Sequence, residues 1–398
     1  HDTCRRQRQM CIRDSPGIMS LVADYSARTI DNSIAGSYDV DATSLNWRIM
    51  DDLAVRYSEQ TAVKAPDLGD LFLPQITAFS RADDPCDYRF RDVGRNPEQR
   101  RANCDAEGIP ADFVSLVVNA TARGVTGGNP NLINEVADTV STGIVYQPNW
   151  WGDVFFGSLN LAADYIEIQL NDYVTSFSLT QNMEACYDYD TYPNSQFCDS
   201  FTRDADFEVV DFQTGLINAG LIDFATYVYK ADFAFDVAEL ASFVSRENVA
   251  MDLGSMAVRW RATQEDFFAS ADSGAAEDLS SATGQFGNDE WFYDTAVEWV
   301  YGDWYVWVQG NSRSGGVIDI NRQYDDEYLG YDGNPIYEFD GYTTYNGGVG
   351  YYVNDDTTLR VNFYNLMDYD GFEEDVFTPE ADLLFIGRQV NASLNVRF

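Results

Sequence analysis

The stretch Gly387-Arg388-Gln389-Val390-Asn391-Ala392-Ser393-Leu394-Asn395-Val396-Arg397-Phe398 decides the fold, because apolar and polar residues alternate along it. One face carries Ile386, Val390, Ala392, Leu394, Val396 and Phe398, and the other carries Gln389, Asn391, Ser393, Asn395 and Arg397. This period-two pattern predicts a β-strand with one apolar and one wet face. A transmembrane barrel, with lipid outside and a wet lumen, produces that division, and so does a soluble sandwich with one solvated face.

The same alternation recurs upstream and predicts about twelve antiparallel strands. We expect them near residues 18–30, 36–49, 53–65, 135–147, 154–170, 213–233, 241–264, 287–301, 303–322, 341–353 and 356–367, and at the terminal stretch. Long acidic, aromatic loops are expected at 66–134, 171–212, 266–286, 323–340 and 368–382. They alternate along the chain with turns of a few residues. The long loops therefore gather at one end of the predicted sheet and the short turns at the other. This asymmetry favours an all-β, antiparallel outer-membrane β-barrel over the sandwich.

The amino-acid composition excludes several classes of function. The 398 residues include 25 Lys+Arg and 65 Asp+Glu, and a net charge of −40 disfavours nucleic acid as a partner. The chain is 45% hydrophobic and 15% aromatic, too much for a disordered acidic chain. The single histidine, His1, disfavours triads and His-ligated metal sites.

The first residues differ from the rest. Arg5 to Asp14 form a basic, cysteine-containing segment before an acidic body, and the composition changes at Ser15-Pro16. The segment resembles the translation of a transposase-type sequencing adapter. We therefore expect residues 1–15 to be a non-native leader on a sequence of metagenomic origin, and residues 16–398 to be the natural domain. A genuine basic leader is the alternative.

The four remaining cysteines form two close pairs, Cys86 with Cys104 and Cys186 with Cys198. Neither has zinc-site spacing, and acidic neighbours disfavour thiolates. Two loop disulfides, and hence an oxidising compartment, are the favoured interpretation. Four separate buried thiols are the alternative.

Several motifs resemble the TonB-dependent receptors, a family of plugged outer-membrane transporters. Val63-Lys64-Ala65-Pro66-Asp67-Leu68-Gly69-Asp70-Leu71-Phe72 resembles the family's RAPNIGELF stretch, and Gly128-Asn129-Pro130-Asn131-Leu132 its GNPNL stretch. Leu359 to Asp368 resembles its NLFD strand, Gly387 to Phe398 its terminal strand, and the Cys86–Cys104 loop fits a subgroup. The resemblance covers about residues 17–398.

The resemblance implies a barrel of about 22 strands around a plug, of which this chain would supply the carboxy-terminal part. The plug and the TonB-contacting segment would lie upstream, so this fragment would not close or fold stably alone. The implied function is energy-coupled uptake of a scarce ligand of siderophore-iron, saccharide, peptide or cobalamin type in the bacterial outer membrane. Implied partners are the TonB complex, the barrel-assembly machinery at the strand ending in Phe398, outer-membrane lipid and the small-molecule ligand. A surface-binding or adhesion barrel without energy coupling is the alternative.

We expect no catalytic residues, cofactor or resident metal, because the carboxylates cluster in loops such as Asp325-Asp326-Glu327, where mutual solvation explains them. A weak calcium loop at Asp368, Asp370 and Gly371 is an alternative to a simple turn. The strong negative charge slightly favours neutral saccharides or peptides over anionic chelates as ligands.

Loop tyrosines are the candidate ligand contacts, because aromatic faces stack on sugars or chelate rings. They are Tyr187, Tyr189, Tyr192, Tyr324, Tyr328, Tyr331 and Tyr337. Loop packing or a membrane-interface girdle explains them equally well. Trp150, Trp151 and Trp304, at the short end, are expected in such a girdle.

Overall fold

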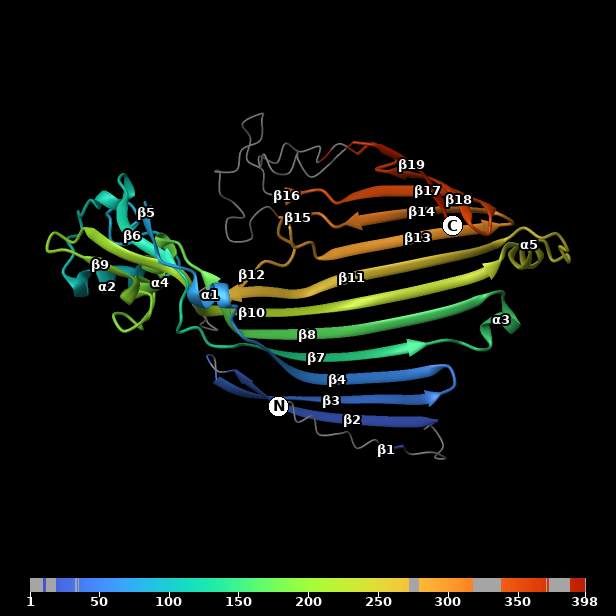
Figure 1. Ribbon diagram of the computed structural model, residues 1–398, viewed down its shortest axis with the longest axis horizontal. Coiled ribbons are helices and arrows are strands. Elements are labelled where there is room, and N and C mark those ends of the chain that lie inside the picture. The colour runs from blue at the N-terminus through green and yellow to red at the C-terminus, as the bar shows by residue number, and fades with distance from the viewer. Residues whose placement is uncertain are drawn as a thin grey trace.

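The computed structural model describes residues 10–11, 19–32, 34, 36–271, 279–317, 338–369, 371 and 387–397. These residues form one large, curved antiparallel sheet with a separate lobe beyond one of its ends (Figure 1). Within these ranges, no helix is long and apolar enough to cross a membrane.

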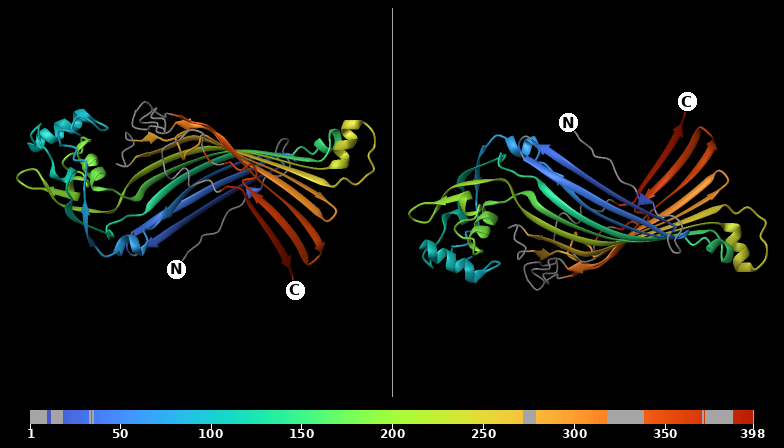
Figure 2. Two further views of the ribbon diagram at one scale, coloured as in Figure 1. Left: turned by 90° about the horizontal axis from the view of Figure 1, so that it is seen from above. Right: turned by 90° about the horizontal axis from the view of Figure 1, so that it is seen from below.

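Twelve long strands make the sheet, each antiparallel to the next. They are β2 (Ser20–Asn32), β3 (Gly36–Met50), β4 (Leu53–Lys64), β7 (Glu135–Tyr146), β8 (Ser158–Ser176), β10 (Val209–Asp236), β11 (Ser255–Ala271), β13 (Trp291–Tyr301), β14 (Trp304–Arg313), β17 (Tyr342–Asn354), β18 (Thr357–Tyr364) and β19 (Gln389–Val396). The two-residue β1 (Met10–Cys11) pairs with β2. The sheet curves without closing, and β2 and β19 are the outermost of its twelve long strands (Figure 2). The expected all-β antiparallel fold is therefore confirmed.

Strand register gives the sheet two chemically distinct faces. One row of register partners is apolar across eight strands: Leu159, Phe233, Val258, Val297, Val308, Gly347, Phe363 and Val390. The adjacent row is mostly polar: Asn160, Asp232, Arg259, Ala296, Gln309 and Asn346. Because side chains alternate along a strand, neighbouring rows point to opposite sides. We call these sides the apolar face and the polar face.

The strand expected at 241–264 is wrong in its first half. Residues Val237–Ser245 form helix α5, and β11 begins only at Ser255. Apolar residues at 237, 240, 241 and 244 repeat every three to four positions, which is helical spacing. Arg246, in the left-handed conformation at φ 57°, ends the helix. A second short helix, α3 (Trp151–Val154), delays β8 to Ser158 instead of 154.

Other boundaries also moved. The strand expected to run to 322 ends at Arg313, before the short pair β15 (Gly316–Val317) and β16 (Glu338–Phe339). The strand expected at 287–301 begins at Trp291, after β12 (Ser280–Ser281). Ile386 and Phe398 lie outside the described residues.

The two longest connections fold together into the lobe, which we define as residues 76–127 and 177–208. The first contributes β5 (Ile76–Ser80), α2 (Pro97–Glu107), η1 (Leu116–Val118) and β6 (Ala122–Gly127), preceded by α1 (Leu68–Phe72). The second contributes α4 (Leu179–Tyr187), η2 (Cys198–Ser200) and β9 (Phe201–Arg203). Strand β10 begins inside the lobe, where it pairs with β6 and β9. The main cluster of buried hydrophobic residues lies in this lobe and at the start of β10, and it includes Phe177, Leu179, Met183, Phe201 and Phe212.

Candidate functional site

Two disulfides cross-link the lobe internally. Cys86 is bonded to Cys104, with Cα atoms 5.6 Å apart, and Cys186 to Cys198, with Cα atoms 4.9 Å apart. These are the pairs expected from the sequence. Each closes a short loop and, by the loss of chain entropy in the unfolded state, stabilises the lobe by about 3 kcal/mol.

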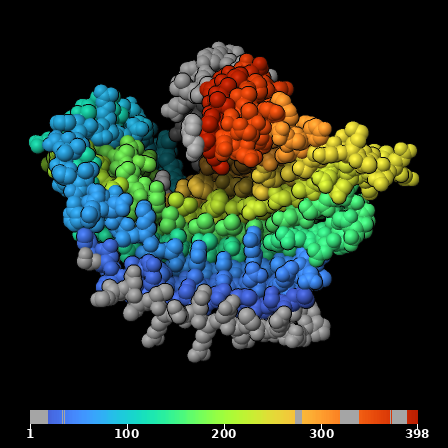
Figure 3. Space-filling model, turned by 45° about the vertical axis from the view of Figure 1, so that its right-hand side comes forward, coloured from blue at the N-terminus to red at the C-terminus, as the bar shows by residue number. Residues whose placement is uncertain are grey.

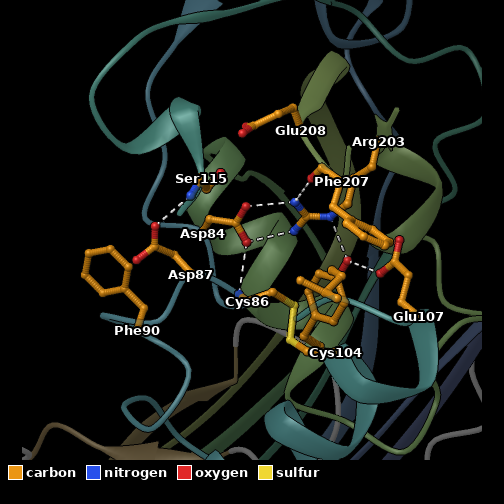
Figure 4. A network of polar contacts seen from close by, with 12 residues as sticks. Asp84, Cys86, Asp87, Phe90, Cys104, Glu107, Ser115, Arg203, Phe207 and Glu208 are labelled. Carbon is orange, nitrogen blue, oxygen red and sulfur yellow. Dashed lines mark hydrogen bonds and ion pairs between the residues drawn. A yellow bond between two sulfur atoms is a disulfide. The ribbon is translucent and has the colours of Figure 1, made fainter. Parts of the chain in front are cut away.

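A buried network centred on Arg203 joins the two insertions (Figure 4). The Arg203 guanidinium donates to both carboxylate oxygens of Asp84 at 2.7 and 2.8 Å and, through Nε, to the Tyr187 hydroxyl at 2.9 Å. That hydroxyl in turn donates to Glu107. Burial acts to lower the pKa of Arg203, but the bonds to Asp84 prevail and raise it. Burial is the main cause of the raised pKa of the Tyr187 hydroxyl.

A second buried cation repeats this arrangement. Arg100 on α2 donates to Asp188 at 2.5 and 2.6 Å and to Glu184 at 3.2 Å, both from the other insertion. Asn103, one helical turn on, donates to the backbone carbonyls of Tyr187 and Tyr189 at 2.8 Å each. The insertions are therefore held together by directional polar contacts as well as by apolar packing.

The structure brings three of the predicted ligand-contacting tyrosines together. Tyr187 is 1% exposed, and its ring stacks on that of Tyr192 with centroids 5.4 Å apart. Tyr192 also donates to Glu107 at 3.3 Å, and burial raises its pKa to about 12. Tyr189 is half-buried against the same core. Tyr187 therefore offers a ligand no surface in this conformation, and ligand contact by these tyrosines stays a prediction.

The other four predicted tyrosines, Tyr324, Tyr328, Tyr331 and Tyr337, lie outside the described residues, as does Asp370 of the suggested calcium loop. Asp368 accepts from the backbone amide of Arg388 at 2.7 Å. Within the described ranges, no group of three or more His, Cys, Asp or Glu is placed to hold a metal ion.

The polar face carries ion pairs that the sequence did not reveal. Arg56 on β4 donates to Asp164 on β8 at 2.6 to 2.8 Å, across the intervening β7. The strand between them places Gly143 in register with both, and a Cβ there would lie 1.9 Å from the Asp164 Oδ1 atom. Alternation along each strand predicts which face a residue such as Arg56 or Asp164 occupies. Whether the two side chains meet depends on the register of three neighbouring strands, which alternation does not give.

A cavity of about 550 Å³ opens on the polar face where β13, β14, β17, β18 and β19 approach the lobe end of the sheet. Its walls are Phe292, Asn311, Arg313, Tyr342, Thr344, Asn346, Tyr364, Asn365, Gly387 and Gln389. Amides, hydroxyls and aromatic rings dominate this lining. Among the described lining residues Arg313 is the single charged one, and Asp289 already pairs with that charge at 2.6 Å.

Aromatic side chains form two belts on the apolar face. The belt nearer the lobe connects Tyr165, Tyr227, Tyr229, Trp291 and Tyr293 by centroid distances of 4.8 to 6.3 Å. The belt at the other end includes the pairs Trp299–Tyr301 and Trp304–Tyr351, at 5.8 and 4.6 Å. On β13 the belts are eight residues apart, from 291 to 299, or about 27 Å along the strand. An apolar band of about this height between aromatic girdles is typical of strands that cross an outer membrane.

Solved receptor structures share this fold. Two structures of the ferric enterobactin receptor PfeA from Pseudomonas aeruginosa match 98% of this chain and 44% of theirs, with TM-scores of 0.57 and 0.56 at 13% and 12% identity. The siderophore receptor PirA from Acinetobacter baumannii matches 95% of this chain and 43% of its own, with a TM-score of 0.55 at 12% identity. No protein-family model and no curated protein matches the sequence. The chain thus spans less than half the length of these receptors and has the fold of the barrel portion it covers, as the TonB-dependent receptor motifs predicted.

Proposed function

We propose that this chain is the carboxy-terminal barrel portion of a bacterial outer-membrane receptor that imports a scarce ligand by energy coupling to TonB. The observation that carries the proposal is the two-faced sheet, with an apolar band between two aromatic belts on one side and charged and amide groups on the other. Such a sheet needs lipid on one face and water on the other. The lobe lies beyond the end of the sheet at which β8 ends and β13 begins, on the side we assign to the exterior (Figure 1).

The polar-face cavity suggests the class of ligand. Side-chain amides donate and accept hydrogen bonds, and aromatic rings stack on sugar faces, so the lining suits a neutral polyhydroxyl compound. Binding of an anionic iron chelate would be favoured by a positive charge that has no anionic partner, whereas Arg313 already pairs with Asp289. We therefore place neutral saccharides ahead of anionic siderophores, with peptide and cobalamin-type ligands between them.

Expression of the natural open reading frame that encodes this chain tests the proposal. We expect the product in the outer-membrane fraction, and accumulation of a radiolabelled oligosaccharide or ferric siderophore that is lost in a host without TonB. Surface binding with no TonB-dependent accumulation would instead support an adhesion barrel. A product found only in the soluble fraction would contradict the membrane assignment.

A cavity variant tests the ligand class. Replacing Gln389 by alanine removes one amide from the cavity and should weaken binding of a neutral oligosaccharide about tenfold, the usual value of one or two hydrogen bonds. Gln60→Ala is the matched control, because Gln60 lies on the polar face of β4, far from the cavity. Equal affinities of both variants in equilibrium binding would remove the cavity from the ligand site.

A further inference from the structure

Two short helices form an aromatic projection at the end of the sheet opposite the lobe. Helices α3 and α5 occupy the connections between β7 and β8 and between β10 and β11. Their rings contact one another and the end of β10 through a continuous series of pairs, with centroids 4.6 to 6.3 Å apart. The members are Trp150, Trp151, Phe155, Phe156, Phe233, Phe235 and Phe243. We call residues 148–157 and 237–254 the shelf.

The shelf combines one anchored carboxylate with exposed apolar side chains. The Glu239 carboxylate accepts from the backbone amide of Gly157 at 3.1 Å and lines a cavity with Ser158 and Glu298. Val244 is 72% exposed, Val154 is 59% exposed and the ring of Phe243 is half-exposed, and we call these exposed apolar side chains the apolar side of the shelf. The segment around α5 projects beyond the sheet in the space-filling view (Figure 3). Within the described residues, nothing covers this apolar side.

The exposed apolar side continues the apolar face of the sheet. Phe156 contacts Phe233 at 5.4 Å, and Phe233 is the register partner of Leu159 and Val258 in the apolar row. The Trp150 indole N–H donates to the Tyr146 hydroxyl at 3.0 Å, which gives this ring one polar and one apolar edge. Tryptophan in this arrangement concentrates where hydrocarbon meets the lipid headgroups.

We propose that the shelf lies flat in the headgroup region of the adjacent leaflet and that phospholipid covers its apolar side. This rests on the proposed membrane location of the sheet. Lipid that covers Phe233 on the apolar face would continue over Phe156, Phe243 and Val244 without a break. The same lipid would therefore cover both the apolar face of the sheet and the shelf. Short amphipathic helices with an apolar side of Phe, Trp and Leu bind membrane interfaces in this way. The shelf therefore widens the lipid contact of the barrel at the end away from the lobe.

Spin labels at four exposed valines test the inference in the product of the natural reading frame, with cysteines other than the four disulfide-bonded ones replaced by serine. Val244→Cys reports on α5 and Val154→Cys on α3. Val308→Cys reports on the middle of the apolar face, and Val93→Cys is the matched control in the lobe. The protein is reconstituted in phospholipid vesicles, and accessibility to oxygen, which enters lipid, is compared with accessibility to a water-soluble nickel chelate.

We expect the oxygen-to-nickel ratio at positions 244 and 154 to be several-fold higher than at position 93 and to approach that at position 308. A ratio at 244 and 154 like that at 93, with 308 in lipid, would overturn the shelf inference and leave the proposed function standing. Low accessibility to both reagents at 244 would also overturn it, because a protein would then cover the shelf. A label at 308 in water would overturn both proposals.

Discussion

Arg203 in the lobe and Arg259 in the sheet each pair with a carboxylate, yet their surroundings differ completely. The Arg203 side chain is 4% exposed and its partner Asp84 is fully buried, whereas Arg259 and its partner Glu298 are each nearly half exposed. The lobe is built like a soluble domain, with its own core, disulfides and buried charges. Among the described residues, the cluster of buried hydrophobic side chains belongs to the lobe and the start of β10, so we expect the stability of the sheet to depend on what lies against its two faces.

The largest effect should come from removing the buried cation. Arg203→Met leaves Asp84 unpaired in the lobe and should lower the free energy of lobe opening by about 3–5 kcal/mol. Arg259→Met is the matched control, and it should cost less than about 1 kcal/mol because that pair is solvated. Hydrogen exchange of lobe peptides against sheet peptides measures both. Similar losses in the two variants would contradict the difference between the regions.

Breaking one cross-link should have the next largest effect. The double substitution Cys186→Ala with Cys198→Ala should lower lobe stability by about 3 kcal/mol, because a short closed loop is released in the unfolded state. The sheet peptides should exchange unchanged in the same experiment. Faster exchange throughout the sheet would show that the two regions unfold as one unit.

A glycine substitution tests the sheet alone. Gly143→Ala drives a methyl group into the Asp164 carboxylate and should cost about 1–3 kcal/mol by displacing the Arg56 pair. Gly69→Ala, where an added Cβ meets nothing within 4 Å, is the control. Thermal unfolding of the membrane-reconstituted protein compares them. An unchanged midpoint of thermal unfolding for Gly143→Ala would mean that the Asp164 side chain can move away from the new methyl group without destabilising the protein.

The smallest effect concerns alkaline pH. Since the folded lobe raises the pKa of Tyr192 to about 12, the protonated hydroxyl contributes stability that is full below pH 10, the ordinary pKa, and is lost as pH rises through about 12. Tyr192→Phe should reduce the fall in lobe stability at alkaline pH. At neutral pH it should lower the free energy of lobe opening by only about 1 kcal/mol, the usual contribution of one hydrogen bond. Lobe hydrogen exchange measured across this pH range would show the difference, and an identical alkaline transition would contradict it.

The strands of the sheet could be predicted well because the alternation of apolar and polar side chains is a local property, whereas register between strands is not. The terminal pattern from Gln389 to Val396 and the close cysteine pairs required no tertiary information. The end of α5 was misassigned to a strand because Ala241, Ser242 and Phe243 alternate between apolar and polar side chains within a helical repeat. The Asp84–Arg203 pair spans 119 positions, and no spacing rule links residues so far apart. Tyr187 looked like an exposed loop aromatic because its burial depends on the other insertion.

Strand β10 is common to both regions and has 28 residues, from the lobe core to the start of α5. Its pairing with β8 shifts register on both sides of Gly220, beside the ring of Tyr173. The pairing of β10 with β8 then continues without a break from Ile222 to Ala234. In mechanical terms, we expect a sideways load on the lobe to bend β10 more readily at the interrupted pairing around Gly220 than along this continuous stretch.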